Sequence, residues 1–310
     1  MHIAIWIGAG LLSILLLTIL ISYITFRTVF LSIKEKHFKL YDGLDGELTE
    51  KKKISRDLVD AFAKIEYEEV SVLSHDGLRL FGRYYHSAES APLEIQFHGY
   101  KSMYGRDFAG IAADSLARGH NVLIVDQRAH GKSEGKVISF GILEKYDVLS
   151  WVEYAIKRFG EDTKIMLVGM SMGAATVLMS AALDLPRNVV GIHADCPYSS
   201  AEKIIKKVCR DIKIPPALAF PFIRLGGLIF GRFDISDGTV YEAVKNTDIP
   251  ILLIHGDADG FVPCEMSDEV SAIGKNVTYL KVKEAPHGLS FIFDHGAYKS
   301  ALDNFVSKIF

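Results

Sequence analysis

The pattern of apolar and polar positions separates an uncharged beginning from an alternating remainder. Residues from Ile3 to Phe26 include no Asp, Glu, Lys or Arg. As a helix this run would reach about 36 Å, enough to cross a hydrocarbon core of about 30 Å. A signal peptide would have a basic start, a shorter apolar core and a small-residue cleavage site, which are missing here. A buried core helix is the remaining alternative. The pattern predicts one transmembrane anchor within residues 1–33.

The next segment is polar and then helical. From Lys34 to Lys53 the chain is charged and dotted with glycine, which is typical of a spacer. Apolar residues then recur with the helical period at Ile54, Leu58, Ala61, Phe62 and Ile65. We expect a juxtamembrane spacer and helix over residues 34–66, with the helix packed against the domain that follows.

From residue 67 to the end, strand-like and helix-like segments alternate. Two short apolar runs flank His75-Asp76-Gly77, which is the signal of a hairpin. Further strands are expected at residues 93–97, 121–125, 164–168, 189–194, 249–254 and 277–282. Helical patterns separate most of these strands. The alternation predicts an α/β domain over residues 67–310, with a mostly parallel central sheet and helices on both faces.

A serine lies directly after one of the expected strands. The run Lys164-Ile165-Met166-Leu167-Val168 leads into Gly169-Met170-Ser171-Met172-Gly173 and then into a helix-like segment. In a strand–turn–helix context, G-x-S-x-G forms a nucleophile elbow, because its glycines permit a sharp turn that exposes the serine oxygen. Ser171 is therefore the candidate nucleophile.

Acids and a histidine follow this serine in the order that catalysis requires. A serine hydroxyl needs a base to take its proton and an acid to orient that base, and after an elbow the acid precedes the histidine. Asp257 and Asp259 follow the strand at 249–254, and His287 follows the strand at 277–282. Parallel strands place their chemistry at their carboxyl ends. His287 is thus the candidate base, and both aspartates are candidate acids.

Four local motifs can be compared with a known family. They are His98-Gly99-Tyr100, the segment from Asp126 to Ser133, the elbow, and the segment from His255 to Pro263. With these motifs the chain resembles the α/β-hydrolases, and among them the serine aminopeptidase and lysophospholipase-like group, from about Val70 to the C-terminus. The resemblance implies the α/β-hydrolase fold with a helical cap.

The same resemblance implies roles for individual residues. It makes Asp259 the acid, with Asp257 as its rival, and it makes the backbone N–H groups of Tyr100 and Met172 the oxyanion hole. One departure is Ala129, where the group usually has glycine. Alanine adopts a positive φ less readily than glycine, so we expect that loop to be slightly reshaped.

The interval from about 200 to 246 interrupts the alternation of strands and helices. α/β-Hydrolases that are similar to this chain have their cap at this point. The interval holds the apolar stretches Ile214–Ile223 and Leu225–Phe230. Three roles are open for them: lining an acyl pocket, docking the cap onto the core, or contacting a bilayer.

Composition and charge add four points. The 310 residues have a formal net charge of −3 with dispersed basic residues, so there is no case for nucleic acid. The three cysteines have no disulfide-framework or metal-ligand spacing. Asp195, at a strand end, is expected to accept hydrogen bonds from local backbone N–H groups, and lining the site is the alternative. The basic residues nearest the apolar run all follow it, namely Arg27, Lys34, Lys36 and Lys39. By the positive-inside rule this predicts a cytoplasmic domain.

Together these observations predict a membrane-anchored serine hydrolase that cleaves carboxylic esters through an acyl-enzyme on Ser171. The chemistry needs no metal or organic cofactor. The expected partners are a small-molecule or lipid-like ester and the membrane, and the oligomeric state is open. A peptidase of the serine aminopeptidase type, or a non-catalytic binding protein on the same scaffold, are the alternatives. We also expect a form that starts near Lys51 to be soluble and active on small esters.

Overall fold

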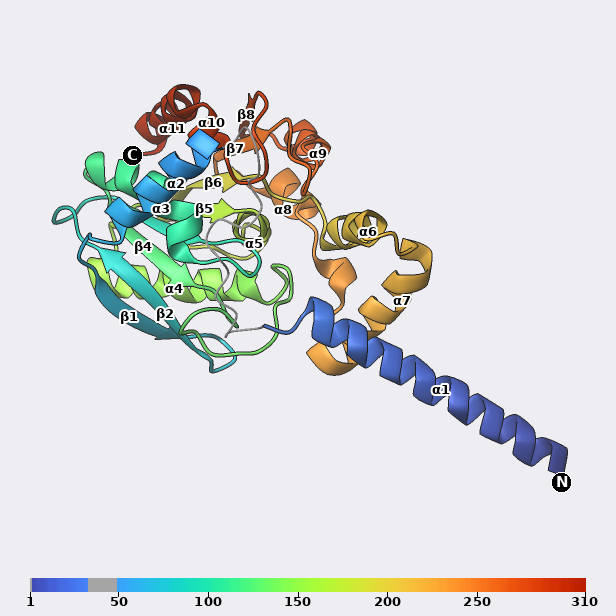
Figure 1. The fold of residues 1–310 in the computed structure, drawn as a ribbon. Helices are drawn as coiled ribbons and strands as arrows, with labels where there is room; N and C mark the ends of the chain where they lie inside the picture. The colour runs from blue at the N-terminus through green and yellow to red at the C-terminus, as the bar shows by residue number, and fades with distance from the viewer. Residues whose placement is uncertain (1, 33–48) are drawn as a thin grey trace.

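An eight-stranded sheet forms the centre of the protein, which the computed structural model describes over residues 2–32 and 49–310 (Figure 1). The strand order across the sheet is β1-β2-β4-β3-β5-β6-β7-β8. β2 pairs antiparallel with β1 and β4, and all other pairings are parallel. The strands are β1 (Glu68–Leu73), β2 (Arg79–Tyr85), β3 (Leu93–Phe97), β4 (Asn121–Asp126), β5 (Ile165–Met170), β6 (Val189–Asp195), β7 (Ile251–Gly256) and β8 (Val277–Val282).

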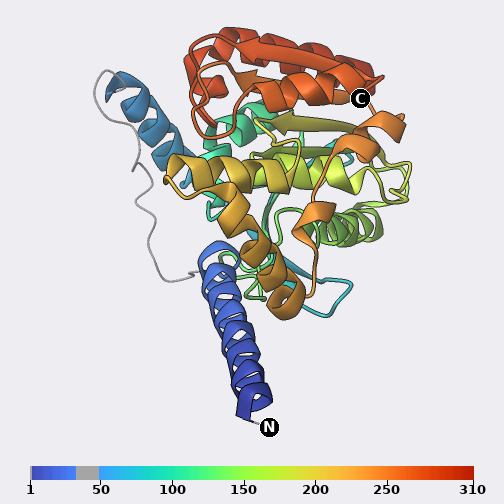
Figure 2. The same ribbon diagram turned by 90° about the vertical axis from the view of Figure 1, so that its right-hand side faces the viewer.

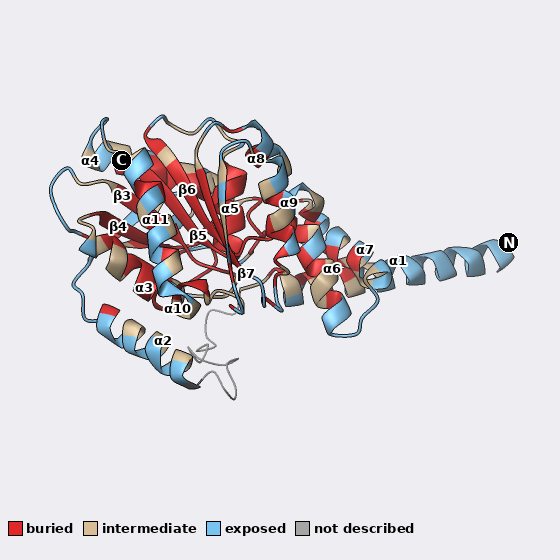
Figure 3. Ribbon diagram, turned by 90° about the horizontal axis from the view of Figure 1, so that it is seen from above, coloured by how far each residue is buried: buried red, intermediate tan, exposed pale blue. Residues whose placement is uncertain are grey.

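Helices cover both faces of this sheet, and the inner strands are therefore buried on both sides. Strands β3, β4, β5 and β7 are buried at every residue (Figure 3), which explains their continuous apolar runs. In β4, Leu123 and Val125 belong to the core on one face, and Val122 and Ile124 belong to the core on the other. The hairpin and the mostly parallel sheet are as the sequence predicts.

The helices outside the cap divide between the two faces. α4 (Glu144–Phe159) and α5 (Met172–Ser180) contribute to one core, and α3 (Tyr104–Ala117) and α11 (His295–Ile309) contribute to the other. The remaining helices of the domain are α2 (Thr49–Phe62), α9 (Glu265–Ile273) and α10 (Ser290–Phe293). α2 packs on α3, and the ring of Phe62 at its end lies 4.9 Å from that of Tyr85 in β2.

Five short elements connect β6 to β7 and form the segment that we call the cap. They are α6 (Ala201–Asp211), α7 (Pro216–Gly226), the π-helix η2 (Gly227–Gly231), the 3-10 helix η3 (Ile235–Asp237) and α8 (Tyr241–Asn246). Cap residues such as Ile204, Phe220 and Ile223 are buried, so part of the apolar surface of the cap docks onto the core.

A long apolar helix, α1 (His2–Val29), extends away from the domain on the side of the cap (Figure 1). Its last two turns lie beside α7 and η2 (Figure 2). Contact is close because Gly226 has no side chain: a Cβ there would lie 2.5 Å from the carbonyl oxygen of Ser22. Phe26 and Phe30 are buried in the core of the domain.

The contact of α1 with the cap bears on the predicted domain boundaries. Most of the predicted spacer, residues 33–48, lies outside the described residues, so the boundaries at 33 and 66 stay predictions. A form that starts near Lys51 would lack Phe30, which is completely buried in the core, and its expected solubility and activity stay predictions. Removal of residues 1–50 would expose the apolar surfaces that pack on Phe26 and Phe30.

The loop that contains Ala129 keeps the backbone that glycine would favour. Ala129 has a φ of 65°, which is a left-handed conformation that costs a non-glycine residue about 1 kcal/mol or more. Ala129 therefore carries local backbone strain, and the expected reshaping of this loop stays a prediction.

Candidate active site

The nucleophile elbow is formed where β5 passes into α5. Ser171 lies between them with φ 55° and ψ −113°, a strained backbone of the kind found at functional sites. Both glycines are sterically required, because a Cβ on Gly173 would lie 1.8 Å from the carbonyl oxygen of Phe97, and one on Gly169 would lie 2.4 Å from Gly173. The turn is tied to β6 by the Ser171 N–H, which donates to the carbonyl of Asp195 at 2.8 Å.

His287, in the loop after β8, lies between Ser171 and Asp259. Its Nδ1 is 2.6 Å from Asp259 Oδ2, and its Nε2 is 2.9 Å from Ser171 Oγ. A carboxylate only accepts hydrogen bonds, so the imidazole proton is on Nδ1 and Nε2 is free to accept from the serine hydroxyl. The fold thus brings the three predicted residues into one hydrogen-bonded chain, and their catalytic role stays a prediction.

Four donors hold the Asp259 carboxylate in place. Oδ1 accepts from the backbone N–H groups of Phe261 and Val262, each at 2.8 Å. Oδ2 accepts from His287 and, at 3.1 Å, from His255. Burial alone would raise the pKa of this carboxyl, but the hydrogen bonds from the two histidines outweigh it and hold the pKa well below its usual value. Asp259 is therefore ionised at neutral pH.

The rival acid, Asp257, lies outside this chain of hydrogen bonds. Its Oδ1 accepts from the backbone N–H of Glu284 at 2.6 Å, and its side chain is exposed. Asp257 thus fixes the loop that leads to His287 and does not touch the imidazole.

His255 holds the loop after β7 by hydrogen bonds, as its place in a turn motif of the sequence indicates. Its Nε2 lies 2.9 Å from the carbonyl oxygen of Val262 and also faces Asp259, so that nitrogen must bear the proton. Its Nδ1 then accepts from the Ser267 hydroxyl at 2.6 Å. His255 thereby joins the acid to the loop that follows it.

The loop after β3 brings Tyr100, one of the two predicted oxyanion donors, beside the elbow, and the other donor, Met172, directly follows Ser171. A Cβ on Gly99 would lie 3.4 Å from that of Ser171, so the loop passes close to the nucleophile. Within residues 2–32 and 49–310, no protein group accepts a hydrogen bond from the N–H of Tyr100 or Met172. Two unpaired N–H groups beside a serine are what an oxyanion hole requires.

Three side chains hold this loop in shape. The Gly99 N–H donates to Asp107 Oδ2 at 2.7 Å, and the Lys101 N–H donates to His130 Nε2 at 3.0 Å. His98 Nδ1 donates to the carbonyl of Gly99 at 2.9 Å. The N–H groups of Gly99 and Lys101, on either side of Tyr100, are therefore already bonded within the protein, whereas that of Tyr100 is not.

A buried polar cluster lies behind the elbow. The Tyr298 hydroxyl donates to Asp195 Oδ2 at 3.0 Å and lies 3.1 Å from His193 Nε2. Asp195 thus has a tyrosine from α11 as its partner, which corrects the expectation of local backbone donors. Burial raises the pKa of Asp195 to about 6 and lowers that of His193 to about 4.

Two groups of side chains within the described residues bring three possible metal ligands together. In one, Cys196 joins Asp259 and His287, whose atoms are already engaged in the hydrogen bonds above. Burial also keeps the Cys196 thiol neutral by raising its pKa. The other group is His75, Asp76 and Asp147, and there the Arg128 guanidinium binds both carboxylates.

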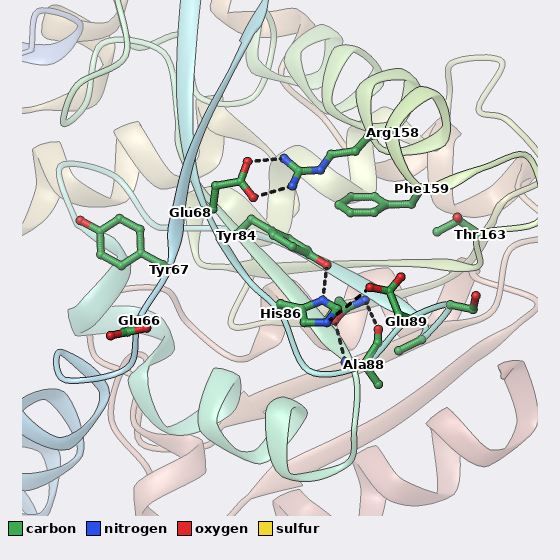
Figure 4. A pocket seen from close by; sticks show the side chains of 13 residues that line it. Glu66, Tyr67, Glu68, Tyr84, His86, Ala88, Glu89, Arg158, Phe159 and Thr163 are labelled. Atoms are coloured by element: carbon green, nitrogen blue, oxygen red, sulfur yellow. Dashed lines mark hydrogen bonds and ion pairs between the residues drawn. The ribbon is translucent and has the colours of Figure 1, made fainter.

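A hollow of about 540 Å³ lies at the amino ends of the parallel strands β3, β4 and β5 (Figure 4). An Arg158–Glu68 ion pair and a hydrogen bond between Tyr84 and His86 occupy its wall. Because parallel α/β sheets bind their ligands at the carboxyl ends of the strands, this hollow is not part of the candidate site.

Comparisons with known proteins agree with this architecture. The model of the serine aminopeptidase S33 family matches residues 93–223. The uncharacterized protein YqkD of Bacillus subtilis is 26% identical over 200 residues, which are 63% of this chain and 64% of that protein. Thiohydrolase aneE of Aspergillus aculeatus is 30% identical over 156 residues, 49% of this chain and 46% of that protein. The chain thus spans less than two thirds of either relative.

Solved structures share the fold. Esterase Pf2001 of Pyrococcus furiosus superposes with a TM-score of 0.65 at 24% identity, over 82% of this chain and 93% of that one. Est1E of Butyrivibrio proteoclasticus, solved with ferulic acid, has a TM-score of 0.59 at 22% identity, over 77% and 98%. The chain therefore has the α/β-hydrolase fold, and its residues 93–223 match the model of the serine aminopeptidase S33 family.

Proposed function

We propose that this protein is a serine hydrolase that cleaves carboxylic esters through an acyl-enzyme on Ser171. The observation that supports it best is the hydrogen-bonded chain from Ser171 through His287 to the ionised Asp259. Because Asp259 holds the Nδ1–H tautomer, Nε2 is available to take the serine proton.

The steps follow from this geometry. Ser171 Oγ attacks the ester carbonyl carbon while its proton moves to His287 Nε2, and the resulting oxyanion lies between the N–H groups of Tyr100 and Met172. The imidazolium then gives that proton to the departing alcohol, which leaves the acyl group on Ser171. Water attacks the acyl-enzyme with His287 again as base, and the acid and the free serine are released.

The charges of the cap favour an ester over a peptide with a free amino terminus. An aminopeptidase needs an unpaired carboxylate to bind the substrate amine. Three of the five cap acids are already in ion pairs, namely Glu202 with Lys206, Asp211 with Lys207 and Asp234 with Arg224, which leaves Asp237 and Glu242 for this role. The esterases that share the fold point in the same direction.

We also propose that α1 anchors the enzyme in a membrane. Among the described residues it is the one helix that is long and apolar enough to cross a membrane. Its mean hydropathy is 2.5 over an 18-residue window, of which none is buried. The hydroxyls of Ser13 and Thr18 donate to carbonyls one turn earlier, as they must in lipid. Arg27 and the lysines that follow it, outside the described residues, favour a cytoplasmic domain.

The cap offers a surface that suits this arrangement. Leu218, Leu228 and Ile229 are exposed on α7 and η2, the segments that pack beside α1. Because α1 passes into its contact with the cap without a linker, a membrane-inserted α1 would hold these side chains near the bilayer surface. A lipid-like ester is then the natural class of substrate.

A panel of p-nitrophenyl esters of rising acyl length, set beside aminoacyl anilides, tests the proposed function. We expect the full-length protein in detergent to hydrolyse the esters and to leave the anilides intact, and Ser171→Ala to remove ester hydrolysis. Cleavage of the anilides with equal efficiency would instead favour the peptidase, and ester hydrolysis that survives in Ser171→Ala would exclude Ser171 as the nucleophile.

A further inference from the structure

The end of α1 is capped by the loop that bears the oxyanion donor. The last carbonyl groups of a helix have no partner within the helix. The Tyr100 hydroxyl donates to the carbonyl of Val29 at 2.7 Å, and Lys101 Nζ lies 3.5 Å from the carbonyl of Thr28. A cation at this position also suits the negative end of the helix dipole.

Aromatic packing joins the same two segments. Phe30 is completely buried, and its ring lies edge-on to those of Phe140, at 6.0 Å, and Phe233, at 5.1 Å. Phe140 also contacts Tyr100, whose ring stacks on that of Phe140 at 5.1 Å with an interplanar angle of 27°. The ring of Tyr100 is therefore held by the residue that also contacts the end of α1.

The backbone after α1 completes the connection. The Ile138 N–H donates to the carbonyl of Phe30 at 2.7 Å, and the Ser32 N–H donates to the carbonyl of Lys136 at 2.9 Å. These bonds pair the chain after α1 with the segment that leads to Phe140. The last turn of α1 is thus fixed to the domain on two sides.

From these contacts we infer that the last turn of α1 positions the oxyanion hole through the side chain of Tyr100. The inference rests on the proposed function, in which the N–H of Tyr100 stabilises the oxyanion. That N–H stabilises the oxyanion only if its position is held within about 0.5 Å of the productive one. The side chain of the same residue, Tyr100, is anchored to Val29. Loosening α1 from the domain should then lower the rate of catalysis and not only the stability of the protein.

The first test is Tyr100→Phe in the full-length protein in detergent. This change keeps the backbone N–H and the ring, and removes only the hydrogen bond to Val29. We expect kcat for a short activated ester to fall about five-fold, the equivalent of one hydrogen bond, with KM unchanged. The inhibition constant of a trifluoromethyl ketone, whose adduct oxyanion occupies the hole, should rise by the same factor.

Tyr23→Phe is the matched control for this test. Tyr23 is exposed, and its ring packs on that of Phe230 at 5.1 Å in the same contact between α1 and the cap. We expect the control to keep the wild-type kcat and inhibition constant.

The second test separates α1 from the cap at a distance from Tyr100. In Gly226→Val the new side chain would collide with Ser22 and Phe26, whereas in Gly10→Val it would meet nothing within 4 Å. We expect a fall of kcat of at least five-fold in the first and none in the second. Because both changes disturb one connection, Tyr100→Phe should have little further effect in the Gly226→Val background.

Wild-type kcat and inhibition constant in Tyr100→Phe would overturn the inference. Simple additivity of the two changes would also overturn it. Neither result would affect the proposed hydrolase, provided that Ser171→Ala is inactive in the same assay. Full activity of Ser171→Ala would instead remove the proposed function, and this inference with it.

Discussion

His255 and Asp259 are joined by a hydrogen bond of 3.1 Å from Nε2 to Oδ2, the same oxygen that contacts His287. The acid of the candidate triad is therefore held by two imidazoles, of which only one faces the serine. The second is fixed in turn by Ser267. His255 is a positioning residue in this arrangement.

We predict that His255→Ala lowers kcat about ten-fold with little change in KM. The reason is that Asp259 loses one of its charge-assisted hydrogen bonds, each of which contributes about 1.5 kcal/mol or more. Steady-state kinetics on a short ester measures the effect. Ser267→Ala, which leaves His255 in place, should cost less, and an equal loss in both variants would contradict this order.

The choice between the two aspartates can be tested in the same assay. Asp259→Asn should lower kcat by about 10⁴, because an amide favours the wrong imidazole tautomer, as it does in the serine proteases. Asp257→Asn should change kcat by less than about ten-fold, since the Asp257 carboxylate accepts a hydrogen bond from the backbone N–H of Glu284 and none from His287. The opposite ranking would make Asp257 the acid.

Asp195 should make the stability of the protein depend on pH. Burial raises its pKa from 3.8 to about 6, so between these pH values the folded chain keeps a proton that the unfolded chain has lost. Asp195 should therefore contribute a fall of up to about 3 kcal/mol in the free energy of unfolding as pH rises from about 4 to about 6. His193, whose pKa burial lowers to about 4, contributes an opposing rise over the same range. Asp195→Asn should remove the fall and leave the rise.

Thermal unfolding at pH 4.5, 6 and 8 measures the effect of Asp195. Asp57→Asn, a change of an exposed residue, is the control and should keep the wild-type dependence. If the melting temperature of Asp195→Asn relative to wild type is the same at all three pH values, Asp195 does not titrate in this range.

The membrane proposal predicts how the full-length protein fractionates. An inserted helix resists extraction by alkaline carbonate, whereas an adsorbed protein is released. We expect the full-length protein to stay in the membrane pellet, and protease added to intact cells to spare the domain. Release by carbonate would contradict the proposal that α1 is a membrane anchor. Digestion of the domain would contradict the predicted cytoplasmic orientation.

The sheet and the elbow could be predicted because their signals are local. Strands buried on both faces require continuous apolar runs, as in Asn121–Asp126, and the turn at Ser171 requires glycines at fixed spacing. The order of acid and histidine follows from the order of the strands. Each of these features depends on residues that are close in sequence.

The contacts that the sequence does not indicate join distant segments. In α1 almost every residue is apolar, so no stripe identifies Ser22 and Phe26 as the face that packs on the cap. The bond between Tyr298 and Asp195 joins residues 103 positions apart. Both contacts depend on how the cap and the last helix fold back onto the sheet, which local patterns do not encode.

The most direct test of the central claim is labelling by a fluorophosphonate, which reacts with an activated serine and forms a stable phosphonyl adduct. After treatment of the full-length protein, mass spectrometry of its peptides should find one adduct, on Ser171, with ester hydrolysis lost in proportion to labelling. Ser171→Ala should remain unlabelled and inactive. An adduct on another serine that accounts for the lost activity, or an unlabelled wild-type protein that still hydrolyses esters, would contradict the assignment of Ser171 as the nucleophile.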